Sequence, residues 1–125
     1  MTIQDAIEIT DEMKPNMMSP RLKCKFLTEI EQLIHDEIVL RHEHPEEQHE
    51  KPVYTEDCDM LTELMVPDPY SMVYVYWLMT KLDMQNQEDA RYNIDRQHFE
   101  NAYDTMSDWW TRNHVPIQVT REFKL

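Results

Sequence analysis

Glycine is absent from the 125-residue sequence. Average usage of about 7% would give a chain of this length roughly nine glycines. The absence excludes the P-loop, the GxGxxG dinucleotide fingerprint, the GxSxG nucleophile elbow and the EF-hand loop, because each needs glycine at a fixed position. It also disfavours tight β-hairpins, whose turns prefer glycine.

Cysteines and long apolar runs are scarce. The two cysteines, Cys24 and Cys58, do not form a CxxC pair. The first residues lack the apolar stretch of a secretory signal peptide, and no run approaches the roughly 18 apolar residues that span a bilayer. We therefore expect synthesis in a reducing cytoplasm, two free thiols and no contact with a membrane.

Basic residues are also few, and the charge is uneven. The formal net charge is −13, from 25 acidic and 12 basic residues. This balance disfavours nucleic acids and anionic membranes as general partners. Residues 42–68 hold nine acidic residues and one basic residue, whereas residues 111–125 hold three basic residues and one acidic residue. The acidic middle and the basic end are expected to meet different surroundings.

Capping signals and apolar periodicity predict two helices in the first third of the chain. One begins at Thr2, where Asp5 completes a weak capping box, and ends at 14–16. The other covers about 20–41, because Ser19 is a good N-cap and proline follows it. Its apolar face is expected to hold Leu22, Phe26, Ile30, Leu33, Ile34 and Ile38, with Lys25, Glu29, Glu31, Gln32 and Asp36 mostly outside that face.

Two more helices are predicted in the second half. Asp68-Pro69 indicates a helix start, and the run from Tyr70 to Met79 is apolar on all sides, which predicts burial on several sides or sharing with a partner. Alternation within this run leaves a strand possible. Polar residues 83–89 mark a turn or a helix junction. The last helix ends near Asn113 and carries the stripe Ile94, Phe99, Ala102, Tyr103, Met106, Trp109 and Trp110.

The predicted architecture is an all-α bundle of about four helices over residues 1–114, with a long, acidic, solvated loop at 42–68. Within that loop, residues 60–66 form either a short strand or one helical turn. The C-terminal tail, 115–125, has a period of two, as a half-buried strand does. The tail pairs either with 60–66 or with a sheet edge of another chain.

No constellation in the sequence indicates catalysis. The acidic segment holds three histidines with three glutamates nearby: His42, His44, His49, Glu46, Glu47 and Glu50. A metal site needs ligands that surrounding groups hold in place, and water is expected to surround this segment. Cys58 lies between Asp57 and Asp59, whose charges blunt the nucleophilicity of a thiol. We predict a non-enzyme with no catalytic residue, metal or cofactor.

Nine of the twelve aromatic residues lie between residues 69 and 110. They form either the core or an interface, where tyrosine and tryptophan are favoured. A domain of this size has little interior to bury them all, which favours self-assembly or a protein partner. The predicted subunit contacts are Tyr70, Tyr74, Tyr76 and Trp77.

Several segments together resemble a family of small proteins of tailed bacteriophages. They are Val66-Pro67-Asp68-Pro69-Tyr70, Val73-Tyr74-Val75-Tyr76-Trp77-Leu78, Arg91-Tyr92-Asn93, Phe99-x-x-Ala102-Tyr103, Ala6-Ile7 and Lys14-Pro15-Asn16. The chain is similar to head–tail connectors, which are adaptor or head-completion proteins. Members of that family have Asn-Gly between the third and fourth helices, where this chain has Asn86-Gln87, so the two helices are either separate or continuous.

The resemblance implies a helical virion protein, assembled in the host cytoplasm, that forms a homo-oligomeric ring below the portal. DNA passes through such a ring without specific binding, and carboxylates repel phosphates. The predicted lumen or rim residues are Glu46, Glu47, Glu50, Glu56, Asp57 and Asp59. The predicted docking residues for a neighbouring subunit, the portal or a tail-completion protein are Ile117, Val119, Arg121, Phe123 and Leu125. An acidic inhibitor that mimics DNA and binds a host protein is the alternative.

Overall fold

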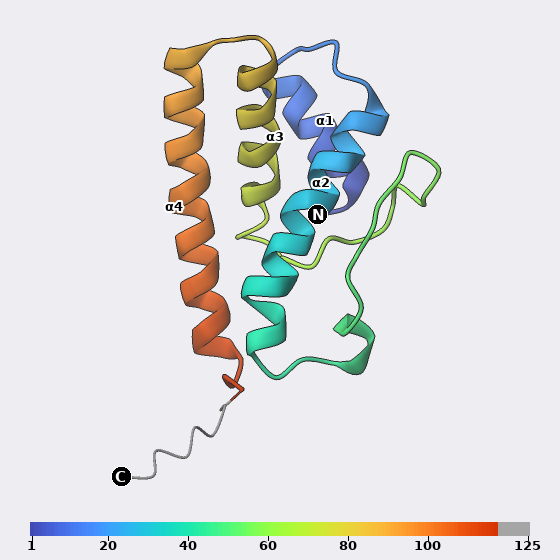
Figure 1. The fold of residues 1–125 in the computed structure, drawn as a ribbon, viewed down its shortest axis with the longest axis vertical. Coiled ribbons are helices and arrows are strands. Elements are labelled where there is room, and N and C mark those ends of the chain that lie inside the picture. Colours follow the sequence, from blue (N-terminus) through green and yellow to red (C-terminus); the bar gives the residue numbers. More distant parts are fainter. Residues whose placement is uncertain (118–125) are drawn as a thin grey trace.

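The computed structural model describes residues 1–117 and is built from helices (Figure 1). Its elements are α1 (Ile3–Met13), α2 (Pro20–Glu37), the short 3-10 helices η1 (Val39–Arg41) and η2 (Glu46–Gln48), α3 (Met72–Gln85) and α4 (Asp89–Asn113). Among the described residues there is no strand, and β pairing is limited to two isolated bridges. The prediction of a small all-α bundle is confirmed.

Helix α3 lies at the centre of the bundle. It forms an antiparallel hairpin with the longer α4, and α1 and α2 pack on its other sides (Figure 1). Nine of its residues are buried, which explains why its sequence is apolar on all sides. The expectation of burial on several sides is therefore confirmed, and the alternative of a strand is wrong.

The starts of the first two helices follow from their capping residues. The Thr2 hydroxyl accepts the N–H of Asp5 at 3.0 Å, and the Asp5 carboxylate accepts the N–H of Thr2 at 3.1 Å. The Ser19 hydroxyl accepts the N–H of Leu22 at 3.2 Å. Each of these bonds satisfies a backbone donor that the first helical turn leaves free. The predicted helix starts are confirmed.

Helix α3 begins later than Asp68-Pro69 suggested. The Asp68–Pro69 peptide bond is cis, and the Ser71 hydroxyl donates to the Asp68 carboxylate. Residues 68–71 form a turn in which Ser71 is the N-cap, so the first helical residue is Met72. The proline belongs to the turn and not to the first turn of the helix.

Helices α3 and α4 are separate. The chain reverses at Gln87, whose φ of 56° lies in the left-handed region that glycine adopts more readily. The N–H of Glu88 donates to the carbonyl of Asp83 at 3.0 Å and closes the turn. Asn86-Gln87 therefore makes the reversal without a glycine.

The buried face of α2 is rotated from the predicted one. Its buried residues are Lys23, Cys24, Leu27, Ile30, Glu31, Ile34 and His35. Leu33, predicted on the apolar face, is 36% exposed, and Ile94 of α4 is 58% exposed. Because α2 packs against both α1 and α3, its covered surface is wide and includes polar side chains that have partners.

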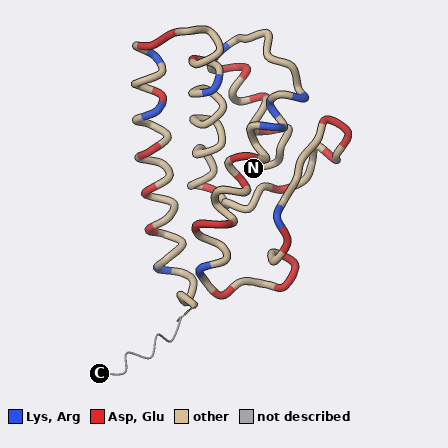
Figure 2. Tube along the Cα trace, viewed as in Figure 1, with Lys and Arg blue, Asp and Glu red and all other residues tan. Residues whose placement is uncertain are grey.

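The segment 42–68 is only partly solvated, which corrects the predicted loop. The segment runs beside α2 and carries many acidic residues (Figure 2). Its last part is packed into the protein, because Leu64 is 5% exposed and Val66 is fully buried. The Ile3 N–H donates to the carbonyl of Thr62 at 3.1 Å, and the Leu64 N–H donates to the carbonyl of Met1 at 3.0 Å. Residues 60–66 form neither a strand nor a helical turn: the Thr62 N–H donates to the carbonyl of Asp59 at 3.0 Å and closes a turn, and Glu63 then makes an isolated bridge with Thr2.

The start of the C-terminal tail pairs within its own chain. The Glu43 N–H donates to the carbonyl of Val115 at 2.7 Å, and the Ile117 N–H donates to the carbonyl of Arg41 at 2.9 Å. Neither predicted partner of the tail, 60–66 or another chain, accounts for this contact. The other predicted docking residues, Val119, Arg121, Phe123 and Leu125, lie outside the described residues.

Candidate functional site

The four predicted interface aromatics separate into two groups. Tyr74 is fully buried and Trp77 is only 8% exposed. The Trp77 indole N–H donates to the carbonyl of Phe26 at 3.0 Å. Both side chains belong to the core of this chain and offer little surface to a neighbour. Tyr70 and Tyr76 are half-buried and remain accessible. The interface hypothesis therefore reduces to these two tyrosines.

Tyr70 and Tyr76 line a groove of about 370 Å³ along α3 and α4. The Tyr70 ring stacks on Trp109 with ring centroids 5.0 Å apart, and the Tyr76 ring stacks on His98 at 5.4 Å. Stacking against Trp109 and His98 of α4 holds the two rings in place, and part of each residue stays exposed. Such amphipathic rings are favoured in protein–protein interfaces.

The predicted lumen or rim carboxylates are all exposed. They are Glu46, Glu47, Glu50, Glu56, Asp57 and Asp59. Within residues 1–117 none of these six forms an ion pair of 4 Å or less. They are therefore available to repel or attract a charged partner.

The histidines of the acidic segment bond to the backbone and to each other. The Nδ1 of His42 lies 2.7 Å from the carbonyl oxygen of Ile38, and the Nδ1 of His44 lies 2.7 Å from that of His42. The Nε2 of His44 faces the Nδ1 of His49 at 3.0 Å. In the part of the chain that the structure describes, no three His, Cys, Asp or Glu side chains could hold a metal ion.

A buried carboxylate on α2 is the feature that sequence reasoning missed. Glu31 is fully buried, although it was expected outside the apolar face. Its Oε1 accepts the Tyr74 hydroxyl at 2.5 Å, and its Oε2 accepts the Tyr54 hydroxyl at 2.8 Å and the Met65 N–H at 3.0 Å. The Glu31 carboxylate therefore ties the 54–65 segment and α3 to α2.

Burial dominates the electrostatics of this cluster. It raises the pKa of Glu31, while the hydrogen bonds from Tyr74, Met65 and Tyr54 act to lower it. Burial and the neighbouring Glu31 charge raise the pKa of both tyrosines. Since Glu31 has no exposed surface, no substrate reaches it, and its role is to hold the 54–65 segment in place. One signal could have revealed it: Glu31 lies four residues after Leu27 and three before Ile34, on their face.

A second buried ionic cluster joins the ends of three helices. The Lys14 ammonium, beyond the end of α1, contacts the carboxylate of Asp83 on α3 and that of Asp95 on α4, the latter at 3.0 Å. Glu88 lies 4.0 Å away. The second oxygen of Asp83 has no partner among the described residues. Lys14 therefore stabilises two carboxylates that would otherwise repel each other.

The Lys14 cluster sets the pKa values of its two aspartates apart. Burial raises the pKa of Asp83 to about 6; Asp95 adds to this shift and Lys14 opposes it. Burial acts to raise the pKa of Asp95 as well, but the neighbouring Asp83 and Lys14 lower it overall. The two carboxyl groups therefore titrate in different pH ranges.

We expect the protein to lose stability through Asp83 as the pH rises from about 4 to about 6. The pKa of Asp83 in the folded state, about 6, exceeds its ordinary value of 3.8, so the folded chain binds more protons than the unfolded chain in this range. Urea unfolding of the native chain and of Asp83→Asn measures this loss. The unfolding free energy of the native chain minus that of the variant should fall as the pH rises. A difference that stays constant would contradict this assignment.

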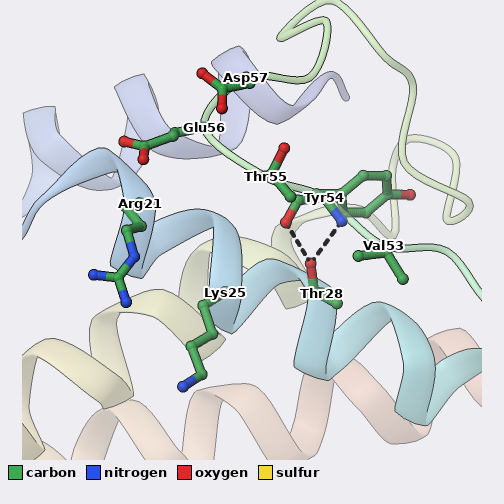
Figure 3. A pocket seen from close by; sticks show the side chains of 8 residues that line it. All are labelled: Arg21, Lys25, Thr28, Val53, Tyr54, Thr55, Glu56 and Asp57. Carbon is green, nitrogen blue, oxygen red and sulfur yellow. Dashed lines mark hydrogen bonds between the residues drawn. The ribbon is translucent and has the colours of Figure 1, made fainter.

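A groove of about 380 Å³ lies between α2 and the segment 53–57 (Figure 3). Arg21 and Lys25 project from α2 on one side, and Glu56 and Asp57 lie across the groove on the other. Sequence reasoning missed the two bases. Lys25 lies four residues before Glu29, the spacing of a helical ion pair, but Glu29 instead pairs with Lys81 at 3.2 Å.

Comparison with known proteins adds no assignment: no protein-family model, curated protein or solved structure matches this chain. None of the helices within residues 1–117 has the length and apolar character needed to cross a membrane. The described surface thus includes the groove of Tyr70 and Tyr76, the groove between α2 and residues 53–57, and an exposed acidic stretch, whereas Glu31 and Asp83 are buried.

Proposed function

We propose that this chain is a structural virion protein, a head–tail connector subunit that forms a ring between the portal and the tail of a bacteriophage. The observation that carries the proposal is the groove of Tyr70 and Tyr76. It presents two accessible aromatic rings that are stacked against α4, as suits a subunit contact. The resemblance of the sequence to head–tail connectors is the reason to place such contacts in a bacteriophage particle.

The exposed carboxylates support the passage of DNA through the proposed ring. The six acidic side chains of the 42–68 segment named above are all exposed. A wall of carboxylates repels phosphates, so DNA slides past it, whereas a basic wall would bind the DNA and retard it. We assign these residues to the lumen or to the rim of the ring.

The tail supplies the proposed contact with a neighbouring subunit or the portal. Residues 115–117 are held against residues 41–43 at the end of α4, so the remaining eight residues begin at a defined position. Their alternating apolar pattern and their basic residues suit addition to the edge of a sheet on an acidic or neutral partner.

An affinity pull-down from cells that produce the phage tests this function. The tagged full chain should recover portal or tail-completion proteins, as identified by mass spectrometry. Deleting residues 118–125 should abolish this recovery while sparing the paired residues 115–117. Recovery of a host DNA-binding protein in place of portal proteins would contradict the connector and support the DNA mimic.

The role of the aromatic groove is tested in the same cells with an untagged second copy of the chain. Replacing Tyr70 and Tyr76 together by serine should reduce recovery of the second copy at least about tenfold, because partly buried tyrosines are common interface anchors. Leu61→Ser is the matched control, since Leu61 is 66% exposed and lies outside the groove. Equal recovery of the second copy by the two variants would show that the groove is not part of the interface.

A further inference from the structure

Helix α4 lies at the edge of the bundle and packs mainly on α3 (Figure 1). Its buried residues are Asp95, Phe99, Met106 and Trp110, out of 25 in the helix. The groove of Tyr70 and Tyr76 follows one side of the α3–α4 hairpin, and a second hollow of about 230 Å³ lies beside Met79 and Ile94. This side of the hairpin therefore offers a long surface for a contact.

The two hollows follow one another along the same side of the hairpin. On α3 they are lined by residues at the spacing of one helix face: Met72, Tyr76 and Met79. On α4 they are lined by residues at the same spacing: Ile94, His98, Asn101 and Thr105. None of these residues is Asp, Glu, Lys or Arg, and interface cores are depleted in charged residues. This surface, the hairpin groove, suits an added helix whose side chains enter between the two walls.

Helix α2 keeps part of its predicted apolar face uncovered. Leu22 and Phe26 are half-buried, and Leu33 is 36% exposed. The three share one face, because Phe26 lies four residues after Leu22 and seven before Leu33. Glu29 lies between them, and its charge is paired with Lys81 at 3.2 Å. The stripe of Leu22, Phe26 and Leu33 is therefore an apolar surface that the rest of residues 1–117 leaves partly open.

The stripe and the hairpin groove have the same length. The stripe runs from residue 22 to residue 33, and the α4 wall of the groove runs from residue 94 to residue 105. Each span covers about 17 Å along a helix axis. The stripe borders Lys81, which lies about two and a half turns from Met72 and thus on the opposite face of α3. A single copy therefore cannot fill its own groove with its own stripe.

Two unpaired basic residues lie beside the start of the stripe. Arg21 and Lys25 are exposed and form no ion pair within residues 1–117. Both side chains extend away from Glu56 and Asp57, which lie across the groove between α2 and residues 53–57 (Figure 3). The two basic charges are therefore available to another molecule.

Two unpaired acidic residues lie beside one end of the hairpin groove. Asp104 and Asp108 flank Thr105, the last residue of the α4 wall. Both are exposed, and neither forms an ion pair with another described residue. Opposite charges beside two surfaces of equal length fix the direction in which the surfaces meet.

We propose that α2 of one copy of this chain lies antiparallel to α4 in the hairpin groove of the next copy. The antiparallel direction brings the two bases of α2 to the two acids of α4. A parallel direction would bring the bases to Arg91, which lines the other end of the groove. The inference rests on the self-assembly in the proposed function and names the helix that fills the groove.

The contact is heterologous, because α2 of one copy meets a different surface on the next. Repetition of such a contact builds a closed ring when the rotation between copies closes, and an open filament when it does not. The net charge of −13 makes copies repel one another, so paired opposite charges at the contact select this arrangement among others. A ring requires a contact of this type, and a two-fold dimer does not.

Charge reversal on each surface tests this contact with the purified full chain. Self-association is measured by sedimentation velocity over a range of concentrations at low salt. The α2 variant carries Arg21→Glu and Lys25→Glu. The α4 variant carries Asp104→Lys and Asp108→Lys. Each variant alone should associate at least about tenfold more weakly than the native chain, because the facing charges are then alike.

An equal mixture of the two variants is the control for folding and for general charge effects. In the mixture the reversed α2 of one variant meets the reversed groove of the other, and the two unchanged surfaces also meet. Association should return to within about threefold of that of the native chain. A mixture that associates no better than the separate variants would overturn the contact. An α2 variant that associates as the native chain does would overturn α2 as the occupant of the groove.

A change in the groove itself tests the apolar part of the contact. Ile94 is 58% exposed in the single chain and would be covered by the added helix. Ile94→Ser should therefore weaken self-association about tenfold. Leu61→Ser is the matched control, since Leu61 is 66% exposed and lies outside the hairpin groove. Equal effects of the two substitutions would contradict the contact.

The contact and the connector function fail separately. A native chain that stays monomeric at every concentration would overturn the contact, while recovery of portal proteins in the pull-down would leave the connector function intact. Self-association with the expected charge dependence, without recovery of portal proteins, would support the contact and contradict the connector.

Discussion

Replacing Glu31 by alanine is expected to lower the free energy of unfolding by about 3–5 kcal/mol. The change leaves the Tyr54 hydroxyl and the Met65 N–H without their acceptor and removes the acceptor of the Tyr74 hydroxyl. Each orphaned buried donor costs about 1–3 kcal/mol, and a cavity adds to the loss. Urea unfolding followed by circular dichroism measures the difference.

Glu29→Ala is the matched control on the same helix. Glu29 is half exposed and makes a single ion pair with Lys81 at 3.2 Å, so its loss should change the unfolding free energy by less than about 1 kcal/mol. Equal effects of the two substitutions would show that the Glu31 hydrogen bonds do not hold the 54–65 segment. A large effect confined to Glu31→Ala supports the buried carboxylate as its anchor.

Lys14→Met is expected to destabilise the protein by about 3 kcal/mol. The ammonium of Lys14 contacts Asp83 and Asp95, whose side chains are 0% and 10% exposed. Without it, two close and largely buried carboxylates lose their counter-charge, and the junction of α1, α3 and α4 is weakened. The measurement is urea unfolding near neutral pH, where both carboxyl groups are mainly ionised in the unfolded chain.

Two further variants make this second prediction specific. Lys51→Met removes a cation whose pair with Asp36, at 3.1 Å, is about half exposed, and should change stability by less than about 1 kcal/mol. Adding Asp83→Asn to Lys14→Met should restore about half of the lost stability, because it removes the repulsion that Lys14 neutralised. A double variant less stable than Lys14→Met alone would contradict this account.

Local signals in the sequence predicted a helix start correctly where a contact between residues close in the chain determines that start. Thr2 and Ser19 start their helices through hydrogen bonds to residues three positions ahead. Asp68-Pro69 misled because proline suits both a helix start and a turn, and the bond from Ser71 to Asp68 selected the turn. The sequence alone could not separate these two uses.

The candidate site was harder to predict than the fold. Four aromatics within residues 70–77 looked alike in the sequence, but packing buried Tyr74 and Trp77 and left Tyr70, in the turn before α3, and Tyr76 accessible. Periodicity places residues on a helix face but does not say how many neighbours that face will have. For the same reason the sequence pattern wrongly predicted Leu33 to be buried and Glu31 to be exposed.

The amino-acid sequence by itself determined the class of this protein: helical, acidic, without glycine-dependent motifs, and with a basic tail of strand period. These properties follow from composition and from contacts within one or two helical turns. Only the tertiary structure decided that Glu31 and Lys14 lie in the interior. Each of these depends on groups far apart in the chain, such as Tyr74 for Glu31 and Asp83 for Lys14, whose proximity no local pattern encodes.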